Sequence, residues 1–259
     1  MSALRSRSRI NGGRWPARLS WLALILLIVA ALLMAGAGPS YRLEWLRLGA
    51  AFGVLRYGAY IAIGAGAVGL LALLAAVLNR HARPALAAGL VVVCAVALLA
   101  VPWQQWQRAR QVPPIHDITT DTEDPPAFVA LASAREAAPN AVDYPGALTA
   151  RQQIEAYPDI QPLVLDLPLD TLRNAVEATA QDQGWEIAAI TDHGLEATAT
   201  TLWFGFQDDV VIRLTERDDG GTRLDMRSAS RLGRSDLGTN AERIRTFLEA
   251  LAQRVASAQ

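Results

Sequence analysis

The chain has 259 residues, of which 52% are hydrophobic, and its formal net charge at pH 7 is −1. This near-neutral total hides two unlike halves, because residues 1–110 carry twelve arginines and one acidic residue, whereas residues 111–259 carry twelve arginines and twenty-four acidic residues. Phosphate backbones would repel the acidic half, which argues against nucleic-acid binding, and the single cysteine, Cys94, excludes a disulfide framework and a thiolate metal cluster.

Three uncharged apolar runs follow an arginine-rich tail of residues 1–18, and they occupy residues 19–38, 57–78 and 85–102. Each run has about the 20 residues that a helix needs to cross a bilayer. Small residues around Gly64 and Gly66 give the second run a face that a neighbouring helix can approach closely, and the alternative is that they only relieve packing. Five tryptophans lie at or beside the ends of the runs, where such rings favour the headgroup level: Trp15, Trp21, Trp45, Trp103 and Trp106. The sequence therefore predicts three transmembrane helices within residues 19–106, with the lipid bilayer as a partner.

The arginines around these runs predict an orientation. Seven lie in the tail and the second loop, and five lie in the first loop and after the third run. Because the charges before the first span usually dominate, we expect a cytoplasmic N-terminus, multi-pass insertion in the inner membrane and a periplasmic second half. Residues 1–37 also resemble a signal peptide with a cleavage site at Ala35-Gly36-Ala37, although the apolar run is long for one. Cleavage would leave the second half on the same side.

Residues 107–162 form a proline-rich acidic segment, called the strap below. It contains the motif PPIHDITTDTEDPP at 113–126 and eight prolines after Val112. Prolines fix their own backbone and disfavour helix in the preceding residue, so the strap cannot be one helix. Its apolar side chains, such as Ile118 and Phe128, argue against a structureless linker. We expect an ordered strap whose carboxylates pair with arginines of the following strands.

Residues 163–257 read as an α+β domain. A short strand at 163–166 precedes a helix that starts near Leu169 and stops before Gly184. Alternating residues predict two hairpins, from strands 185–191 and 195–202 and from strands 209–217 and 222–231. A final helix begins with the capping-box pattern of Thr239 and Glu242. The predicted fold class is thus a multi-span α-helical membrane region followed by an antiparallel sheet with two packing helices, TATA-binding-protein-like or helix-grip-like.

Several motifs, in this order, are similar to those of a known family. They are PPIHDITTD, Pro125-Pro126-Ala127-Phe128, Tyr157-Pro158, Gly184-Trp185, GFQDDVVIRL at 205–214 and DMRSASRLGRSDLGTNAERIRTFL at 225–248. Over residues 110–252 the chain resembles the bacterial and plastid family called domain of unknown function 1499. The resemblance implies a fold and a membrane or lumen-facing setting. It implies no reaction, because the family has no established activity.

A row of arginines is the strongest candidate for ligand binding. Alternation places it on the sheet face opposite Ile212 and Leu214. An arginine fork binds carboxylate or phosphate through two hydrogen bonds, so the row could hold an anionic ligand, a lipid headgroup or another envelope protein. Pairing with acidic residues of the same domain is the favoured alternative. The candidate residues of the row and its following loop are Arg213, Arg227, Arg231, Arg234 and Asp236.

His116 and Asp117 of the strap are the remaining candidates. A single histidine without a partner at ligand spacing matches no metal signature, so neither a metal site nor a cofactor is predicted. No catalytic motif identifies catalytic residues. Two functions stay open: a membrane-anchored binding or scaffolding module of the cell envelope, which we favour, and an envelope hydrolase that uses His116, Asp117 and the 228–236 loop. The hydrolase requires His116 within hydrogen-bond reach of that loop, in a pocket.

Overall fold

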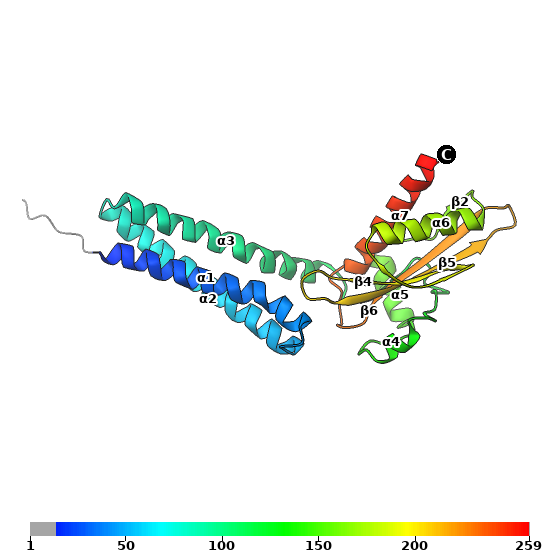
Figure 1. Ribbon diagram of the computed structural model, residues 1–259, viewed down its shortest axis with the longest axis horizontal. Helices are drawn as coiled ribbons and strands as arrows, with labels where there is room; N and C mark the ends of the chain where they lie inside the picture. The colour runs from blue at the N-terminus through cyan, green and yellow to red at the C-terminus, as the bar shows by residue number, and fades with distance from the viewer. Residues whose placement is uncertain (1–13, 259) are drawn as a thin grey trace, which may run out of the picture. The chain divides into compact units, whose positions relative to one another are not determined.

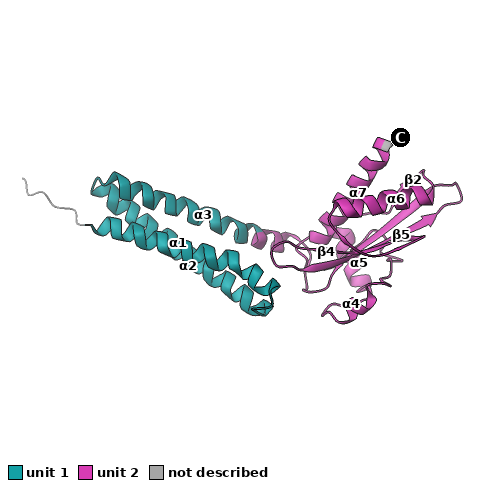
Figure 2. Cartoon of the chain, in the orientation of Figure 1, with its two compact units in different colours: residues 1–104 teal, residues 105–259 magenta. Residues whose placement is uncertain are grey.

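The computed structural model describes residues 14–258, so most of the predicted arginine-rich tail, residues 1–13, lies outside the described residues. The chain divides into two compact units, Met1–Gln104 and Gln105–Gln259 (Figure 2). The boundary falls inside the third long helix, so the end of that helix belongs to the second unit.

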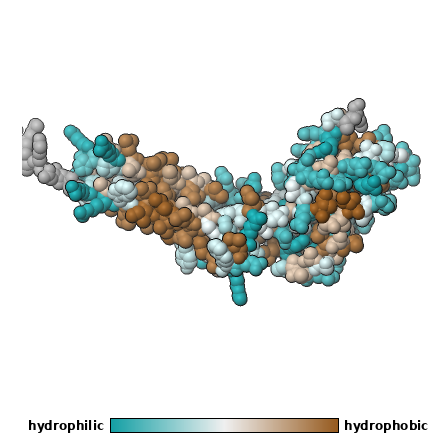
Figure 3. All heavy atoms as spheres, viewed as in Figure 1, coloured by the Kyte–Doolittle hydropathy of each residue, from teal (hydrophilic) through white to brown (hydrophobic). Residues whose placement is uncertain are grey.

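Three long helices account for nearly all of the described part of the first unit: α1 (Trp15–Arg42), α2 (Leu48–Leu78) and the greater part of α3 (Ala82–Gln111) (Figure 1). Each is long and apolar enough to cross a membrane, and on the face shown in Figure 3 hydrophobic residues gather over the middle of the helical unit. The three predicted spans lie inside these helices. α3 continues through the first residues of the predicted strap, because the glutamines, arginines and alanine after Trp103 favour a helix.

A seam of small residues on α2 brings the helices together. A Cβ at Gly58 would lie 2.6 Å from Cγ of Met34 on α1, and a Cβ at Gly69 would lie 3.2 Å from Cγ2 of Val92 on α3. This close approach supplies the packing that holds membrane helices together. Of the predicted small-residue face around Gly64, Ala65 is fully buried and a Cβ at Gly66 would lie 3.5 Å from Cβ of Ala95 on α3, whereas nothing lies within 4 Å of a Cβ added at Gly64. The buried small residues of the seam are Gly58, Ala62, Ala65, Gly69, Ala72 and Ala76.

The second unit is built on a six-stranded antiparallel sheet with the order β1-β6-β5-β4-β3. Short strands β1 (Asp117–Thr119) and β2 (Leu163–Leu165) pair with different parts of the outer edge of β6. The predicted fold class, an apolar helical region followed by an antiparallel sheet with helices, is confirmed. The other strands are β3 (Glu186–Thr191), β4 (Gly194–Thr200), β5 (Gln207–Glu216) and β6 (Thr222–Ser230).

Helices α6 (Leu169–Asp182) and α7 (Thr239–Ala258) pack against one face of this sheet and enclose the main core (Figure 1). Trp185 stacks on Phe247 of α7 with ring centroids 5.0 Å apart. Leu172 of α6 and Met226 of β6 are fully buried in the same cluster. Burial of these apolar side chains is the main favourable term in the stability of the domain.

The strap is part of the domain and is more structured than predicted. It contains β1 and the helices α4 (Ala132–Glu136) and α5 (Ala147–Ala156). Ile118 and Ile160 lie in the main core, so the domain begins well before the predicted boundary at 163. Gln153 of α5 closes the outer edge of β1: its amide oxygen accepts from the Thr119 N–H at 3.0 Å, and its amide group donates to the Thr119 carbonyl at 2.6 Å. A strand edge covered in this way is protected from pairing with another chain.

Candidate functional site

The predicted arginine row lies on the sheet face opposite α6 and α7, and cross-strand register places carboxylates beside it. Arg213 of β5 is directly opposite Asp225 of β6, and Val211 is opposite Arg227. The strap covers this face: Phe128 and Leu131 of the strap pack against the sheet through Val211 and Ala229. The candidate arginines therefore face a covered layer of polar contacts.

At one end of the row, strap carboxylates pair with arginines as predicted. Asp121 lies 2.7 Å from Nη2 of Arg223, and Asp124 lies 2.8 Å from Nη1 of Arg213. Asp225 pairs with both arginines, at 2.8 and 3.2 Å. Burial would raise the pKa of Asp121, but backbone N–H groups of Asp124 and Glu123 and the two guanidinium groups lower it overall. The strap is held here by charge pairs.

In the middle of the row, Arg227 forms a two-bond ion pair with Asp117, at 2.9 and 2.8 Å, and both side chains are almost fully buried. The Arg227 guanidinium also lies 4.7 Å from the ring centroid of Phe128. Burial, together with the nearby Asp117 charge, raises the pKa of the Tyr144 hydroxyl to about 12, although Arg227 opposes the shift. Asp117, a candidate catalytic residue, is thus engaged in an internal contact that fixes β1.

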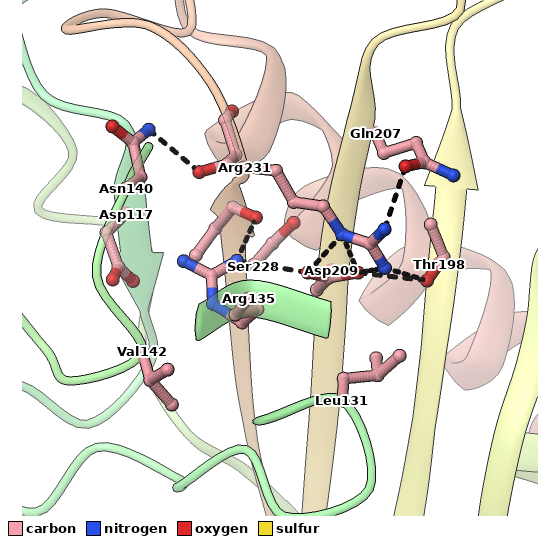
Figure 4. Close-up of polar contacts among 12 residues, drawn as sticks. Asp117, Leu131, Arg135, Asn140, Val142, Thr198, Gln207, Asp209, Ser228 and Arg231 are labelled. Atoms are coloured by element: carbon pink, nitrogen blue, oxygen red, sulfur yellow. Dashed lines mark hydrogen bonds and ion pairs between the residues drawn. The ribbon is translucent and has the colours of Figure 1, made fainter. Parts of the chain in front are cut away.

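At the other end of the row, Asp209 is shared by two arginines (Figure 4). Its carboxylate accepts from Arg231 at 2.8 Å and from Arg135 of α4 at 3.1 Å, and the side chains of Asp209 and Arg135 are both fully buried. Arg135 also donates to the Ala229 carbonyl at 2.9 Å. Burial lowers the pKa of Arg135, and Asp209 opposes this shift. A buried pair of this kind is expensive to break, since removal of one partner leaves an unpaired charge.

Sequence reasoning missed Glu196 of β4, which anchors the strap from the same face. Its carboxylate accepts three backbone N–H groups, from Val129, Ala130 and Leu131, each at 2.9 Å. The signal was present in the alternation of strand 195–202, which puts Glu196 and Thr198 on the covered face. Without knowledge that the strap covers that face, an acidic residue there reads as a solvated one.

His116, Arg234 and Asp236 do not form a catalytic group. The His116 carbonyl accepts from Ser230 N–H at 2.9 Å and from Asn240 at 3.0 Å. Its imidazole Nδ1 is buried and has no hydrogen-bond partner within residues 14–258. Arg234 is exposed. The structure thus brings His116 to the 228–236 loop through its backbone, and the hydrogen-bonded imidazole that the hydrolase requires is not formed in the described part of the chain.

Asp236 has a structural task at the start of α7. Its carboxylate accepts the N–H groups of Gly238 and Asn240, at 2.9 and 2.8 Å. This corrects the prediction that Thr239 caps the helix: Thr239 is the first residue of α7, and its exposed side chain makes no hydrogen bond to a described residue. Burial raises the pKa of Asp236, while the two backbone N–H groups act in the opposite direction. Leu237, between the bonded residues, has φ of +55°, a strained value for a branched apolar residue.

Beside this turn, a second buried polar network joins α7 to the sheet. Arg243 donates to Asp208 at 2.6 Å and to Ser228 at 3.0 Å. Ser228 donates to Asn240 at 2.7 Å, and Asn240 donates to Ser230 at 3.0 Å. Both serines of β6 are thus occupied by structural bonds and neither contacts an imidazole.

A cavity of about 580 Å³ lies where the ends of α3, α6 and β4 meet the start of α7. Its lining residues include Leu237, Gly238 and Thr239 of the turn before α7, Tyr157, Trp185 and three arginines. Two of these arginines are paired: Arg243 with Asp208, and Arg245 with Asp159 at 2.5 Å. The arginines are Arg108, Arg243 and Arg245, and Glu242 adds the one acidic group among the lining residues.

Two of the residues that line this cavity have a polar group without an ion-pair or hydrogen-bond partner among the described residues. Arg108 is exposed and forms no ion pair with a described residue. Tyr157 is 8% exposed, and its buried hydroxyl has no hydrogen-bond partner within the described residues. Burial raises the pKa of this hydroxyl, with a further contribution from Asp236, so it stays protonated and able to donate. Buried hydroxyls nearly always have a partner, and Tyr157 is one of the residues that line the cavity.

Among the described residues, no group of three or more His, Cys, Asp or Glu side chains is arranged to hold a metal ion. In comparisons with known proteins, the family model described as "Protein of unknown function (DUF1499)" matches residues 117–251. This range includes β1 and most of the strap as well as the sheet and α7 as far as Leu251. No curated protein matches the chain.

Proposed function

Since the chain belongs to the DUF1499 family, which supplies no activity, we propose a function from the geometry: a membrane-anchored binding module of the cell envelope. In this proposal α1, α2 and α3 anchor the chain in the inner membrane. The N-terminus lies in the cytoplasm and the α+β domain in the periplasm. The arginine excess before the first span supports this orientation.

The cavity at the start of α7 is the binding site in this proposal, and one observation carries it: the arginines of the row are paired within the domain, whereas Arg108 and the Tyr157 hydroxyl have no partner among the described residues. The row is saturated by carboxylates of the domain and covered by the strap. The cavity has an unpaired guanidinium and an unpartnered hydroxyl in its wall. The row then serves stability, and an anionic or polar ligand enters the cavity.

Binding without catalysis is favoured over hydrolysis. The hydroxyls of Ser228 and Ser230 are hydrogen-bonded to the Asn240 side chain, and His116 accepts from Asn240 through its backbone carbonyl. A nucleophile needs a base within hydrogen-bond reach, and the serines of β6 have none. Scaffolding for another envelope protein is compatible with the same anchor, but the cavity favours a small ligand or headgroup.

The test fills the cavity without disturbing the core. Thr246 is an exposed lining residue of α7, so Thr246→Trp should block the cavity, whereas Glu249→Trp, on an exposed position of the same helix outside the lining, is the matched control. The full-length chain, purified in a mild non-phospholipid detergent, is examined by native mass spectrometry and by a metabolite and lipid binding screen. A ligand bound by the wild type and the control but absent from Thr246→Trp is expected. Equal binding by the wild type and both variants, or no ligand bound to any of them, contradicts the proposal.

A further inference from the structure

The cavity lies at the end of a candidate membrane span, which restricts what can reach it. α3 contains the third apolar run and continues without a break to Gln111. Arg108 and Gln111 of this helix line the cavity. A helix rises about 1.5 Å per residue, so Arg108 lies roughly 8 Å along the axis beyond Trp103. That distance is comparable to the thickness of one headgroup layer, which is about 5–8 Å.

An exposed apolar turn after β4 adjoins the cavity. Thr200 and Thr201, at the end of β4, belong to its lining, and the next residue, Leu202, is 89% exposed. Trp203 follows it and packs edge-on against Phe204 at 5.0 Å, so the turn is held by its own rings. Leucine and tryptophan at an exposed tip are suited to the boundary between acyl chains and headgroups. The turn and the end of α3 both provide interfacial residues beside one cavity.

The chemistry of the wall fits a phosphate ester. Arg108 supplies an unpaired guanidinium, the tightest class of phosphate donor among side chains. The Tyr157 hydroxyl supplies a neutral donor that lacks a partner within the described residues. Glu242, on the same wall, can accept from hydroxyl or ammonium groups at the polar end of a headgroup. We propose that the cavity binds the headgroup of a membrane glycerophospholipid, with its phosphate at Arg108 and Tyr157 and its acyl chains left in the bilayer. This proposal rests on the proposed function and names its ligand.

The experiment compares three probes with the full-length chain in a non-phospholipid detergent, and bound mass is counted by native mass spectrometry. The probes are short-chain phosphatidylglycerol, the diacylglycerol with the same acyl chains, and inorganic phosphate. One phosphatidylglycerol should bind per chain, and Thr246→Trp should abolish this binding. Diacylglycerol lacks the phosphate and should not bind. Inorganic phosphate lacks the glyceride and should bind at least tenfold more weakly than the phospholipid.

Matched variants test the named contacts. Arg108→Gln should weaken phosphatidylglycerol binding about tenfold, since hydrogen bonds to charged groups are the stronger ones. Arg110→Gln removes the same charge from the same helix outside the lining and should change binding less than about twofold, as is usual away from a site. Tyr157→Phe should weaken binding about fivefold with no loss of folded protein, because the hydroxyl has no partner in the domain.

Each alternative result has a separate meaning. Equal losses for Arg108→Gln and Arg110→Gln, equal binding of diacylglycerol, or unchanged binding by Tyr157→Phe would overturn the headgroup assignment. Inorganic phosphate that binds as tightly as the lipid would identify a free phosphate ligand and also overturn it. A different bound mass that Thr246→Trp removes would leave the binding module in place with another ligand, whereas no bound mass at all would remove both proposals.

Discussion

At the scale of single residues, several charged side chains of the domain lie where water cannot reach them. Asp209 and Arg135 are fully buried, and Arg227 and Asp117 are nearly so. Two guanidinium groups, of Arg135 and Arg227, lie 4.6 and 4.7 Å from the ring centroid of Phe128. Removing charges from water is costly unless each finds a partner, so this layer fixes how the strap meets the sheet. The arginine row could be predicted from the sequence, because strand alternation assigns its residues to one face. Arg135, which pairs with Asp209, could not be predicted, because it lies 74 residues from Asp209 in the chain.

The buried pairs predict a strong dependence on one carboxylate. Asp209→Asn should destabilise the domain by about 3–5 kcal/mol, because it leaves Arg135 buried without a counter-charge. Asp219→Asn is the control, since the ion pair of Asp219 with Arg217 is largely exposed and should contribute less than about 1 kcal/mol. A denaturant titration of the full-length chain in detergent, followed by hydrogen exchange in peptides of the α+β domain, measures both. Similar losses for the two variants would contradict the buried-pair account.

At the scale of helices and strands, the predictable elements are those whose pattern is long. Strands β3, β4, β5 and β6 and helices α6 and α7 were predicted because each repeats its apolar period several times. Strand β1 has three residues, and its partner β6 is more than a hundred residues away, so no local pattern marks it. The cavity was equally hidden, because separate parts of the chain supply its wall. Its residues come together only in the folded domain.

The start of α7 provides a prediction at this scale. Asp236→Ala should cost about 1–2 kcal/mol, since the carboxylate accepts two N–H groups of the first turn and the preceding residue. Thr239→Ala should change stability by less than about 0.5 kcal/mol, as for other exposed side chains. Hydrogen exchange in peptides that cover the first turn of α7 distinguishes the two variants. A larger loss in Thr239→Ala would restore the capping box that the sequence suggested.

At the scale of the whole molecule, charge is divided between the anchor and the domain. The first half carries the arginine excess that predicts orientation, and the second half carries acidic residues that pair with its own arginines. Many of the acidic residues pair within the domain, and in the proposed topology the arginine excess directs insertion of the helices. In the proposed topology, the three candidate spans put the two ends of the helical region on opposite sides of a membrane.

Topology can be checked directly. A reporter enzyme that is active only outside the cytoplasm, fused after Gln111, should be active, because three spans follow a cytoplasmic N-terminus. The same reporter fused after Leu78, at the end of α2, should be inactive. A well-expressed but inactive fusion at Gln111, together with an active fusion at Leu78, would reverse the proposed orientation.

The pH dependence of domain stability follows from the lowered pKa values of Asp121 and Asp159. Burial opposes the shift at Asp121, while backbone N–H groups, Arg223 and Arg213 lower its pKa; the Arg245 hydrogen bond lowers the pKa of Asp159. A lowered folded-state pKa gives stability that is present above the ordinary aspartate pKa and is lost as pH falls through the folded-state value. The denaturant concentration at the unfolding midpoint should therefore decrease as the pH is lowered below about 4. Asp121→Asn should lower the midpoint at pH 7 and flatten the decline, and an unchanged decline would contradict this assignment.

The short connection between α3 and β1 sets the affinity that a lipid ligand needs. Only residues 112–116 separate the two elements, and five residues reach at most about 18 Å when fully extended. In the proposed arrangement, this tether presents membrane lipid to the domain at a high effective concentration, as for any tethered module. Even millimolar intrinsic affinity then gives high occupancy. Exchange of the bound headgroup would be fast, and occupancy would follow the lipid composition around the anchor.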